Sequence, residues 1–269
     1  MLTILLSGVL GYAFVLALVW SLQDRFIYFP SHALVMNPRD VGCPYEDIVI
    51  SPSNGIQLHG WYIPAEKEAG VLVYFHGNAG NIGHRVPVLP LFPRENLSIC
   101  LFDYRGYGRS KGRPSEAGLY ADGRAVIAWL IHERRIPPEK LILLGESLGG
   151  AIAARLAREY PVAGIILISA FPSLADIAAH HYWYFPVRAL LRARYPTADD
   201  LKATNVPVLM IHGRADRIVP LSMAARLREA GGERVRWVVV AGGHNDVLFV
   251  EKGRVQVEIR SFIQTCLGR

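Results

Sequence analysis

The sequence predicts an α/β fold: a mostly parallel, eight-stranded sheet flanked by helices, with a short helical cap and an apolar N-terminal helix. Three observations lead to this class. The chain has 269 residues, of which 51% are hydrophobic and 19% charged, enough for a large buried core and unlike a disordered chain. Short apolar runs alternate with longer helical patterns, which is typical of a parallel sheet with crossover helices. Residues 1–23 carry no charged side chain.

The uncharged segment is predicted to be a single-pass transmembrane anchor over residues 1–22. About 22 helical residues span about 33 Å, enough for a hydrocarbon core of about 30 Å. Trp20 and Arg25 suit a membrane interface. A cleaved signal peptide is the alternative, but its basic start, shorter apolar core and small-residue cleavage site are not clear here. Arg25 and Arg39 favour a cytoplasmic main domain, a weak bias that large domains can override.

A juxtamembrane linker over residues 23–46 is expected to lead into the main domain, residues 47–269. Most strands predicted there are near-continuous apolar runs, as strands buried on both faces should be. Turn residues between the first two predict an antiparallel hairpin. The predicted strands are 47–50, 57–63, 71–75, 98–102, 141–144, 164–168, 208–211 and 236–240, and the predicted helices are 115–133, 147–159, 221–230 and 251–267.

The strongest chemical motif is Gly145-Glu146-Ser147-Leu148-Gly149, which follows the strand 141–144 and opens an alanine-rich helix. In this strand–turn–helix context G-x-S-x-G is a nucleophile elbow: the glycines permit a sharp turn that exposes the serine hydroxyl. The alternative is a serine that caps an ordinary helix.

A nucleophilic serine needs a base, and the base needs an orienting acid. The expected chain order is serine, acid, histidine. Asp216 follows the strand 208–211, and His244 follows the strand 236–240. Because sites in parallel sheets form where the strands end, Ser147, Asp216 and His244 are expected to meet at one edge. The competing candidates for base and acid are His212, His180, His181, Asp199, Asp200 and Asp246.

The glycine-rich loop 76–81 follows the strand 71–75, where the second oxyanion donor of such a site is expected. The candidate donors are the backbone N–H groups of Asn78 and Leu148. The glycines let the backbone approach a developing oxyanion, which two aimed N–H groups stabilise. The His76 side chain itself is expected to have a structural role, bracing neighbouring loops.

Residues 171–200 form a connection between two strands that is far longer than usual, which predicts a cap over a site. Its middle is aromatic, and His181, Trp183 and Phe185 are the candidate substrate-binding residues, since this composition suits an apolar acyl chain. The same aromatics would equally serve to pack the cap onto the core.

No cofactor, metal or nucleic acid is predicted. Cys43, Cys100 and Cys266 lie far apart without C-x-x-C spacing, which excludes a cysteine-rich metal site. The net charge is +6, but the basic residues are scattered and lack the aromatic interleaving of a nucleic-acid-binding surface. The predicted partners are a small-molecule or lipid acyl ester and the membrane.

These motifs together resemble the α/β-hydrolase superfamily and, more narrowly, its Bem46-like branch of membrane-anchored serine hydrolases, of the serine aminopeptidase S33 type. The matching segments are 26–30, 75–81, 103–110, 145–150 and 243–246. The resemblance implies an α/β-hydrolase fold with nucleophile Ser147, acid Asp216, base His244 and oxyanion donors Asn78 and Leu148.

The chain departs from this pattern where the first helix after the oxyanion loop would run. Pro87, Pro90 and Pro93 stand in that stretch. A proline inside a helix removes a backbone hydrogen bond, so this helix is expected to be short, kinked or displaced.

The predicted function is hydrolysis of carboxylic esters or thioesters, with acyl or lipid-like substrates. The reaction would proceed through a Ser-His-Asp triad and an acyl-enzyme. An S33-type peptidase and a non-catalytic membrane-tethered binding module stay open as alternatives. An aminopeptidase must hold a free α-ammonium, but the cap offers only Asp176, Asp199 and Asp200 as carboxylates. The sequence therefore favours esters over peptides.

Overall fold

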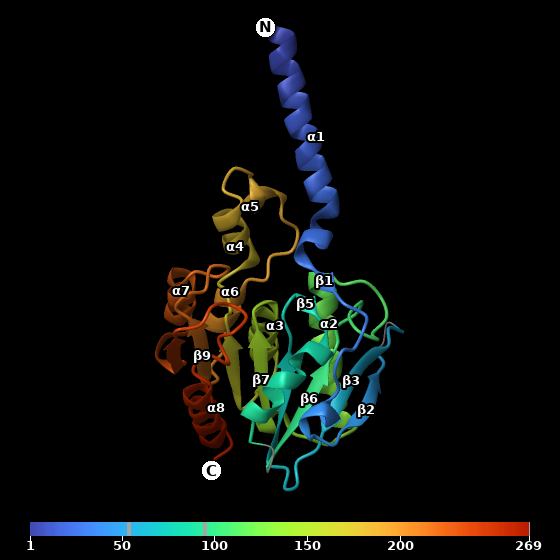
Figure 1. The fold of residues 1–269 in the computed structure, drawn as a ribbon, viewed down its shortest axis with the longest axis vertical. Coiled ribbons are helices and arrows are strands. Elements are labelled where there is room, and N and C mark those ends of the chain that lie inside the picture. The colour runs from blue at the N-terminus through green and yellow to red at the C-terminus, as the bar shows by residue number, and fades with distance from the viewer. Residues whose placement is uncertain (53–54, 94–95, 269) are drawn as a thin grey trace.

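The computed structural model describes residues 1–52, 55–93 and 96–268. Within these residues an eight-stranded sheet lies between layers of helices, and the long helix α1 (Leu2–Ile27) projects away from it (Figure 1). The order of neighbouring strands across the sheet is β10-β9-β8-β7-β4-β6-β3-β2. β2 pairs antiparallel with β3, and β3 antiparallel with β6, whereas the other pairs are parallel. The predicted class and the hairpin are confirmed.

All eight strands lie where the apolar runs predict them, within a few residues at each end. Five of them, β3, β4, β6, β8 and β9, bury every residue, because helices or loops cover both faces. The strands are β2 (Glu46–Ile50), β3 (Leu58–Ile63), β4 (Gly70–Phe75), β6 (Leu97–Phe102), β7 (Leu141–Glu146), β8 (Gly164–Ile168), β9 (Val208–Gly213) and β10 (Val235–Val240).

Two hydrophobic clusters form the core, one on each face of the sheet. The alternation of a strand divides its side chains between them: in β4, Val73 and Phe75 belong to one cluster, and Leu72 and Tyr74 to the other. The first cluster is covered by α2 (Glu116–His132), α3 (Leu148–Glu159) and α7 (Leu221–Gly231), and the second by α8 (Lys252–Cys266) and the 3-10 helix η2 (Ile82–Leu91).

The proline-rich stretch after the glycine-rich loop 76–81 differs from an ordinary crossover helix, as the sequence predicts. Pro87 and Pro90 lie inside η2, which is a 3-10 helix and not an α-helix. Its side chains Val86, Val88 and Leu89 are nevertheless buried against the sheet. This irregular element therefore still closes the second cluster.

The segment expected as a linker is packed onto the domain. α1 continues to Ile27, five residues beyond the predicted end of the anchor at 22. Directly after it, β1 (Phe29–Pro30) pairs in parallel with β5 (Ala79–Gly80). A short 3-10 helix, η1 (Pro38–Val41), leads on to the sheet. Residues 27–33, which we call the strap, thus tie α1 to the loop that follows β4.

The long connection after β8 folds into short helices. α4 (Leu174–His181) and α5 (Val187–Leu190) lie beyond the edge of the sheet beside α1, whereas α6 (Thr197–Lys202) lies against the body of the domain (Figure 1). We call residues 171–200 the cap.

Candidate active site

Ser147 stands at the sharp turn between β7 and α3. Its backbone has φ 50° and ψ −111°, a conformation that non-glycine residues rarely adopt and that is found mostly at functional sites. Its N–H donates to the carbonyl of Ile168 at 2.8 Å. A Cβ at Gly145 would collide with the carbonyl of Gly149, and a Cβ at Gly149 with that of Phe75. The two glycines of the motif are therefore required for this turn to form.

The structure brings Ser147, His244 and Asp216 together. His244 Nε2 lies 3.1 Å from Ser147 Oγ, and His244 Nδ1 lies 2.7 Å from Asp216 Oδ2. The second oxygen of Asp216 accepts the N–H groups of Ile218 at 2.9 Å and Val219 at 2.8 Å. Because β7, β9 and β10 end at the same edge, their following loops deliver the three side chains to one point.

The environment of Asp216 keeps its carboxyl group ionised. Burial raises its pKa, but the hydrogen bond and charge of His244, the N–H of Val219 and the charge of His212 together hold the pKa below its usual range. A carboxylate here accepts the Nδ1–H of His244, which leaves Nε2 facing the serine hydroxyl as a proton acceptor.

The competing bases are engaged elsewhere. His212 is buried, and its Nε2 lies 2.9 Å from the carbonyl of Val219 and 3.4 Å from Asp216 Oδ2. Burial lowers its pKa, with partial compensation from the same two contacts. His181 Nε2 lies 2.8 Å from the carbonyl of Ile218. His212 and His181 thus support the loop that carries the acid.

Two of the three competing acids also have structural partners. Asp246 Oδ1 accepts the N–H of Gly243 at 2.5 Å, which shapes the loop that carries the histidine. Asp200 is buried and pairs with Arg155 at 2.8 Å and with Arg158 at 3.2 Å. Asp199 is exposed at the surface of α6.

The loop 76–81 is held in place by the strap. The carbonyl of Asn78 accepts the N–H of Phe29 at 2.9 Å and the hydroxyl of Tyr107 at 2.8 Å, and its Nδ2 donates to the carbonyl of Ile27 at 2.9 Å. Both the carbonyl group and the side chain of Asn78 are therefore held by hydrogen bonds. Leu148 is the first residue of α3, where N–H groups lack an intrahelical acceptor.

The start of the same loop is braced from within the core. His76 is buried, with Nδ1 2.7 Å from the carbonyl of Gly77 and Nε2 3.5 Å from Asp103 Oδ1. Its ring packs against Tyr104 at a centroid distance of 4.4 Å. These contacts match the structural role expected for His76, which is to brace neighbouring loops.

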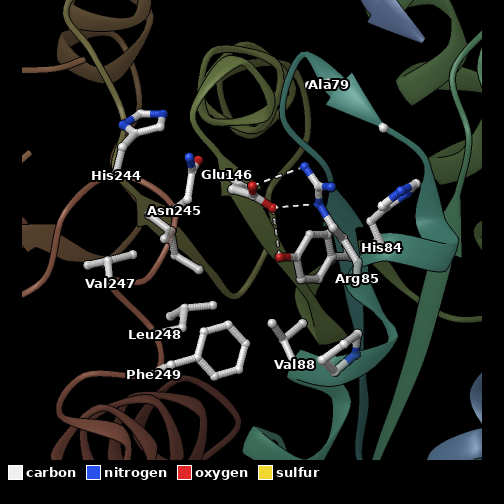
Figure 2. Close-up of a pocket in the computed structure, with 14 residues that line it drawn as sticks. Ala79, His84, Arg85, Val88, Glu146, His244, Asn245, Val247, Leu248 and Phe249 are labelled. Atoms are coloured by element: carbon white, nitrogen blue, oxygen red, sulfur yellow. Dashed lines mark hydrogen bonds and ion pairs between the residues drawn. The ribbon is translucent and has the colours of Figure 1, made fainter. Parts of the chain in front are cut away.

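A cavity of about 480 Å³ lies beside His244 (Figure 2). At its polar end Arg85 forms two hydrogen bonds with Glu146, at 2.9 and 3.0 Å, and the hydroxyl of Tyr74 donates to Glu146 at 3.0 Å. The remainder of its wall is mostly apolar. The lining residues are Tyr74, Ala79, Gly80, His84, Arg85, Pro87, Val88, Glu146, Ile168, His244, Asn245, Val247, Leu248 and Phe249.

The three predicted substrate-binding residues are not among those that line this cavity. His181 faces the loop of the acid, the Trp183 side chain is mostly exposed, and Phe185 stacks on Tyr12 of α1 at a centroid distance of 6.3 Å. Their contact with substrate stays a prediction.

Several residues of the site were missed by sequence reasoning. The wall of the cavity comes from η2 and from the segment after the histidine, where Val247, Leu248 and Phe249 form an apolar run that is visible in the sequence. For the strap, the sequence signal was Phe-Ile-Tyr-Phe-Pro at 26–30. In the part of the chain that the structure describes, no group of three His, Cys, Asp or Glu side chains is arranged to hold a metal ion.

Comparisons with known proteins agree with this architecture. A family model described as the alpha/beta hydrolase fold matches residues 70–191. An uncharacterized protein of Mycobacterium tuberculosis is 41% identical over 253 residues, covering 93% of this chain and 90% of that protein. Protein bem46 of Schizosaccharomyces pombe is 31% identical over 223 residues, covering 76% and 73%.

Among solved structures, an esterase of Pyrococcus furiosus has the same fold, with a TM-score of 0.75 and 19% identity over 90% of this chain and 98% of that one. The fold and the elbow define an α/β hydrolase. Given the identity and coverage of its relatives, the chain belongs to the alpha/beta hydrolase family, in the Bem46-like branch that the resemblance indicates.

Proposed function

We propose that this hydrolase is a membrane-anchored serine esterase or thioesterase that acts on acyl or lipid-like esters. The observation that carries the proposal is the continuous hydrogen-bonded series from Ser147 Oγ through the His244 ring to Asp216, with distances of 3.1 and 2.7 Å. A serine aligned with a base that is itself oriented by a carboxylate is the arrangement needed for nucleophilic acyl transfer.

The mechanism follows from these contacts. His244 Nε2 takes the hydroxyl proton while Ser147 Oγ attacks the acyl carbon, and Asp216 stabilises the resulting imidazolium. The N–H groups of Asn78 and Leu148 stabilise the negative charge on the former carbonyl oxygen. The imidazolium then protonates the leaving alcohol or thiol, which departs as the acyl-enzyme forms. His244 next deprotonates a water that attacks the acyl-enzyme, and its proton returns to Ser147 Oγ as the acid is released.

The cavity supports an acyl substrate. Its volume, about 480 Å³, falls in the range of small-molecule sites, and its wall beside His244 is mostly apolar. Glu146 is the carboxylate among its lining residues, and it is already neutralised by Arg85 and hydrogen-bonded by Tyr74. It is therefore poorly suited to hold the α-ammonium group of a peptide.

Two of the three carboxylates of the cap are also occupied. Asp176 pairs with Arg188 at 2.8 Å and with Arg226 at 3.4 Å, and Asp200 pairs with Arg155. An aminopeptidase needs an unpaired carboxylate at its site, so these pairs favour esters over the S33-type peptidase reading.

We include membrane anchoring by α1 in the proposal. The helix has 26 residues, is long and apolar enough to cross a membrane, and exposes its apolar side chains. Its C-terminal end is integrated into the domain, with Gln23 and Ile27 buried and the strap bound to the loop 76–81. These contacts favour a retained helix over a signal peptide that is removed.

The proposal is tested by reacting the detergent-solubilised full-length protein with a fluorophosphonate probe. Wild type is expected to be labelled, and Ser147→Ala is expected to lose both labelling and hydrolysis of p-nitrophenyl butyrate. Ser222→Ala, an exposed serine of α7, is the matched control and should behave like wild type. An unlabelled wild type would indicate a non-catalytic scaffold. Turnover of aminoacyl-p-nitroanilides above that of the ester would indicate a peptidase.

A further inference from the structure

Four consecutive aromatic residues, Tyr182 to Phe185, lie in the part of the cap that contacts α1. We call them the aromatic tip. The exposed fractions of Tyr182, Trp183 and Tyr184 are 51%, 79% and 54%. Neighbouring rings of the tip contact one another at centroid distances of 4.8 to 6.4 Å. Large exposed aromatic groups that cluster in this way mark an interaction surface.

The aromatic tip is attached to α1. The hydroxyl of Tyr12 donates to the carbonyl of Tyr184 at 3.4 Å, and its ring stacks on Phe185. Further along α1, Gln23 Oε1 accepts the N–H of Arg192 at 2.7 Å. The cap therefore runs beside the C-terminal half of α1, as Figure 1 shows for α4 and α5.

The helical rise gives the depth of this contact. Trp20 and Arg25 stand at the end of the uncharged segment, where a membrane interface is expected. Tyr12 precedes Trp20 by eight residues, which is about 12 Å along an α-helix. One leaflet contributes about 15 Å to a hydrocarbon core of about 30 Å. A tip that contacts Tyr12 therefore lies at the level of the acyl chains of the nearer leaflet.

The chemistry of the tip suits that position. Residues 182–187 contain no charged side chain. The N–H groups of Tyr182, Phe185 and Val187 donate to backbone carbonyls of the cap at 2.8 to 2.9 Å, which reduces the cost of leaving water. Arg188 and Arg192 follow, and Arg192 pairs with Asp24 at 3.3 Å, where α1 would enter the headgroups. Tyr and Trp rings with arginines behind them are typical of a membrane interface.

We propose that the aromatic tip inserts into a phospholipid bilayer beside α1, so that the protein contacts the membrane at two places. This inference rests on the anchoring by α1 proposed above. The cap starts near the site, since Ser169, two residues before it, donates to the carbonyl of His244 at 3.2 Å. Two membrane contacts fix the orientation of the domain and hold the site near the lipid. The substrate class narrows accordingly to acyl esters that reside in the bilayer.

The test uses full-length protein in nanodiscs, in a Cys266→Ser background because Cys43 and Cys100 are buried. An environment-sensitive fluorophore is attached to Tyr182→Cys in the tip. Matched labels are placed at Val9→Cys on α1 and at Glu66→Cys, an exposed residue between β3 and β4. Each label is measured in phosphatidylcholine bilayers with and without a lipid that carries a nitroxide on its acyl chain.

We expect the nitroxide lipid to quench the labels at Tyr182 and Val9 by at least about twofold and to leave the label at Glu66 unchanged. A second label, at Trp183→Cys, is expected to repeat the result for Tyr182. Quenching at Val9 but not in the tip would overturn the insertion and leave the anchor standing. No quenching at either position would overturn both the insertion of the tip and the anchoring by α1. This test does not measure hydrolysis. A protein with a quenched tip that is inactive in the fluorophosphonate and ester assays would therefore contradict the proposed esterase and leave the insertion standing.

Discussion

The acid of the candidate triad depends on two kinds of contact that act on different atoms. One oxygen of Asp216 bonds to His244, and the other accepts two backbone N–H groups of its own loop. The carboxylate is therefore fixed in orientation as well as in charge. His212 is buried behind it, with Nε2 3.4 Å from Asp216 Oδ2, and helps to shield the acid from water.

Replacing the acid by its amide tests this arrangement. Asp216→Asn retains an acceptor for the backbone N–H groups but cannot stabilise an imidazolium, and it favours the wrong tautomer of His244. We expect kcat for p-nitrophenyl butyrate to fall by about 10⁴-fold. Asp246→Asn is the matched control: its amide oxygen can still accept the N–H of Gly243, so a similar loss there would argue against the assignment of the acid.

His212 makes stability depend on pH. Its pKa is lowered by burial in the folded protein, whereas in the unfolded chain a histidine titrates near about 6.5. The unfolded chain therefore binds the proton more readily, and the free energy of unfolding falls as pH drops below about 6.5 through the folded-state pKa. The contribution of Asp216, whose pKa is also lowered, is lost only at more acidic pH, below the usual range of a carboxyl group.

His212→Gln preserves an N–H donor for the carbonyl of Val219 but cannot ionise. Between pH 7.5 and 5.5 we expect wild type to lose more thermal stability in detergent than this variant does. His132→Gln, at an exposed histidine, should follow wild type. Parallel losses in wild type and His212→Gln would assign the acid sensitivity to another group.

At the scale of elements, the strap connects α1 to the loop 76–81, which carries the candidate oxyanion donor Asn78. Its carbonyl at Ile27 and N–H at Phe29 hold Asn78 on two sides, and the carbonyls of Ser31 and Ala33 accept the side chain of Asn81 at 3.0 and 2.7 Å. The core holds the start of the loop through His76, and the strap holds its later part. A donor aimed at a transition state must be held in advance, and the strap does this.

Asn78→Ala removes the bond to Ile27 but keeps the backbone N–H that is the candidate oxyanion donor. A displacement near 1 Å at such a position costs up to about 10²-fold in rate. We expect kcat for p-nitrophenyl butyrate to fall about 10- to 100-fold with KM changed less than about threefold. Asn205→Ala, at an exposed asparagine, is the control. A raised KM with unchanged kcat would assign Asn78 to ground-state binding and not to the oxyanion.

The sequence predicts an element well when a short stretch of residues is enough to indicate it. A strand buried on both faces must be apolar throughout, so β4, β8 and β9 were evident from the sequence alone. The elbow and the loops of the triad likewise follow recognisable strands. The pairing of β1 with β5 involves two residues on each side and has no periodicity. The bond between Arg85 and Glu146 joins residues 61 positions apart, so only the tertiary fold reveals it.

At the scale of the whole molecule, α1 and the α/β-hydrolase domain form one structure. α1 contacts the cap through Tyr12 and Gln23, and it contacts the oxyanion loop through the strap. The sequence predicts a juxtamembrane linker over residues 23–46, and in the structure part of this segment, the strap, is hydrogen-bonded to the loop 76–81. In the proposed membrane arrangement, the end of α1 would set the position of the candidate site relative to the bilayer.

This integration predicts how the protein leaves the membrane. A helix with an uncharged stretch as long as residues 2–23, once buried in hydrocarbon, is not released by high salt or alkaline carbonate, which remove proteins held by charge or by other proteins. We expect the full-length chain to stay in the membrane pellet under both treatments and to be extracted by detergent as an intact polypeptide.

The size of the extracted chain separates the anchor from a signal peptide. Cleavage near the end of the apolar segment would shorten the product by about 20 residues, since a signal peptide has 15–30. It would also remove Tyr12 and with it the contact to the cap. We therefore expect intact mass spectrometry of the extracted protein to include residues 1–27. A shortened chain that carbonate releases would exclude the anchor, and the aromatic tip would then have no helix beside it.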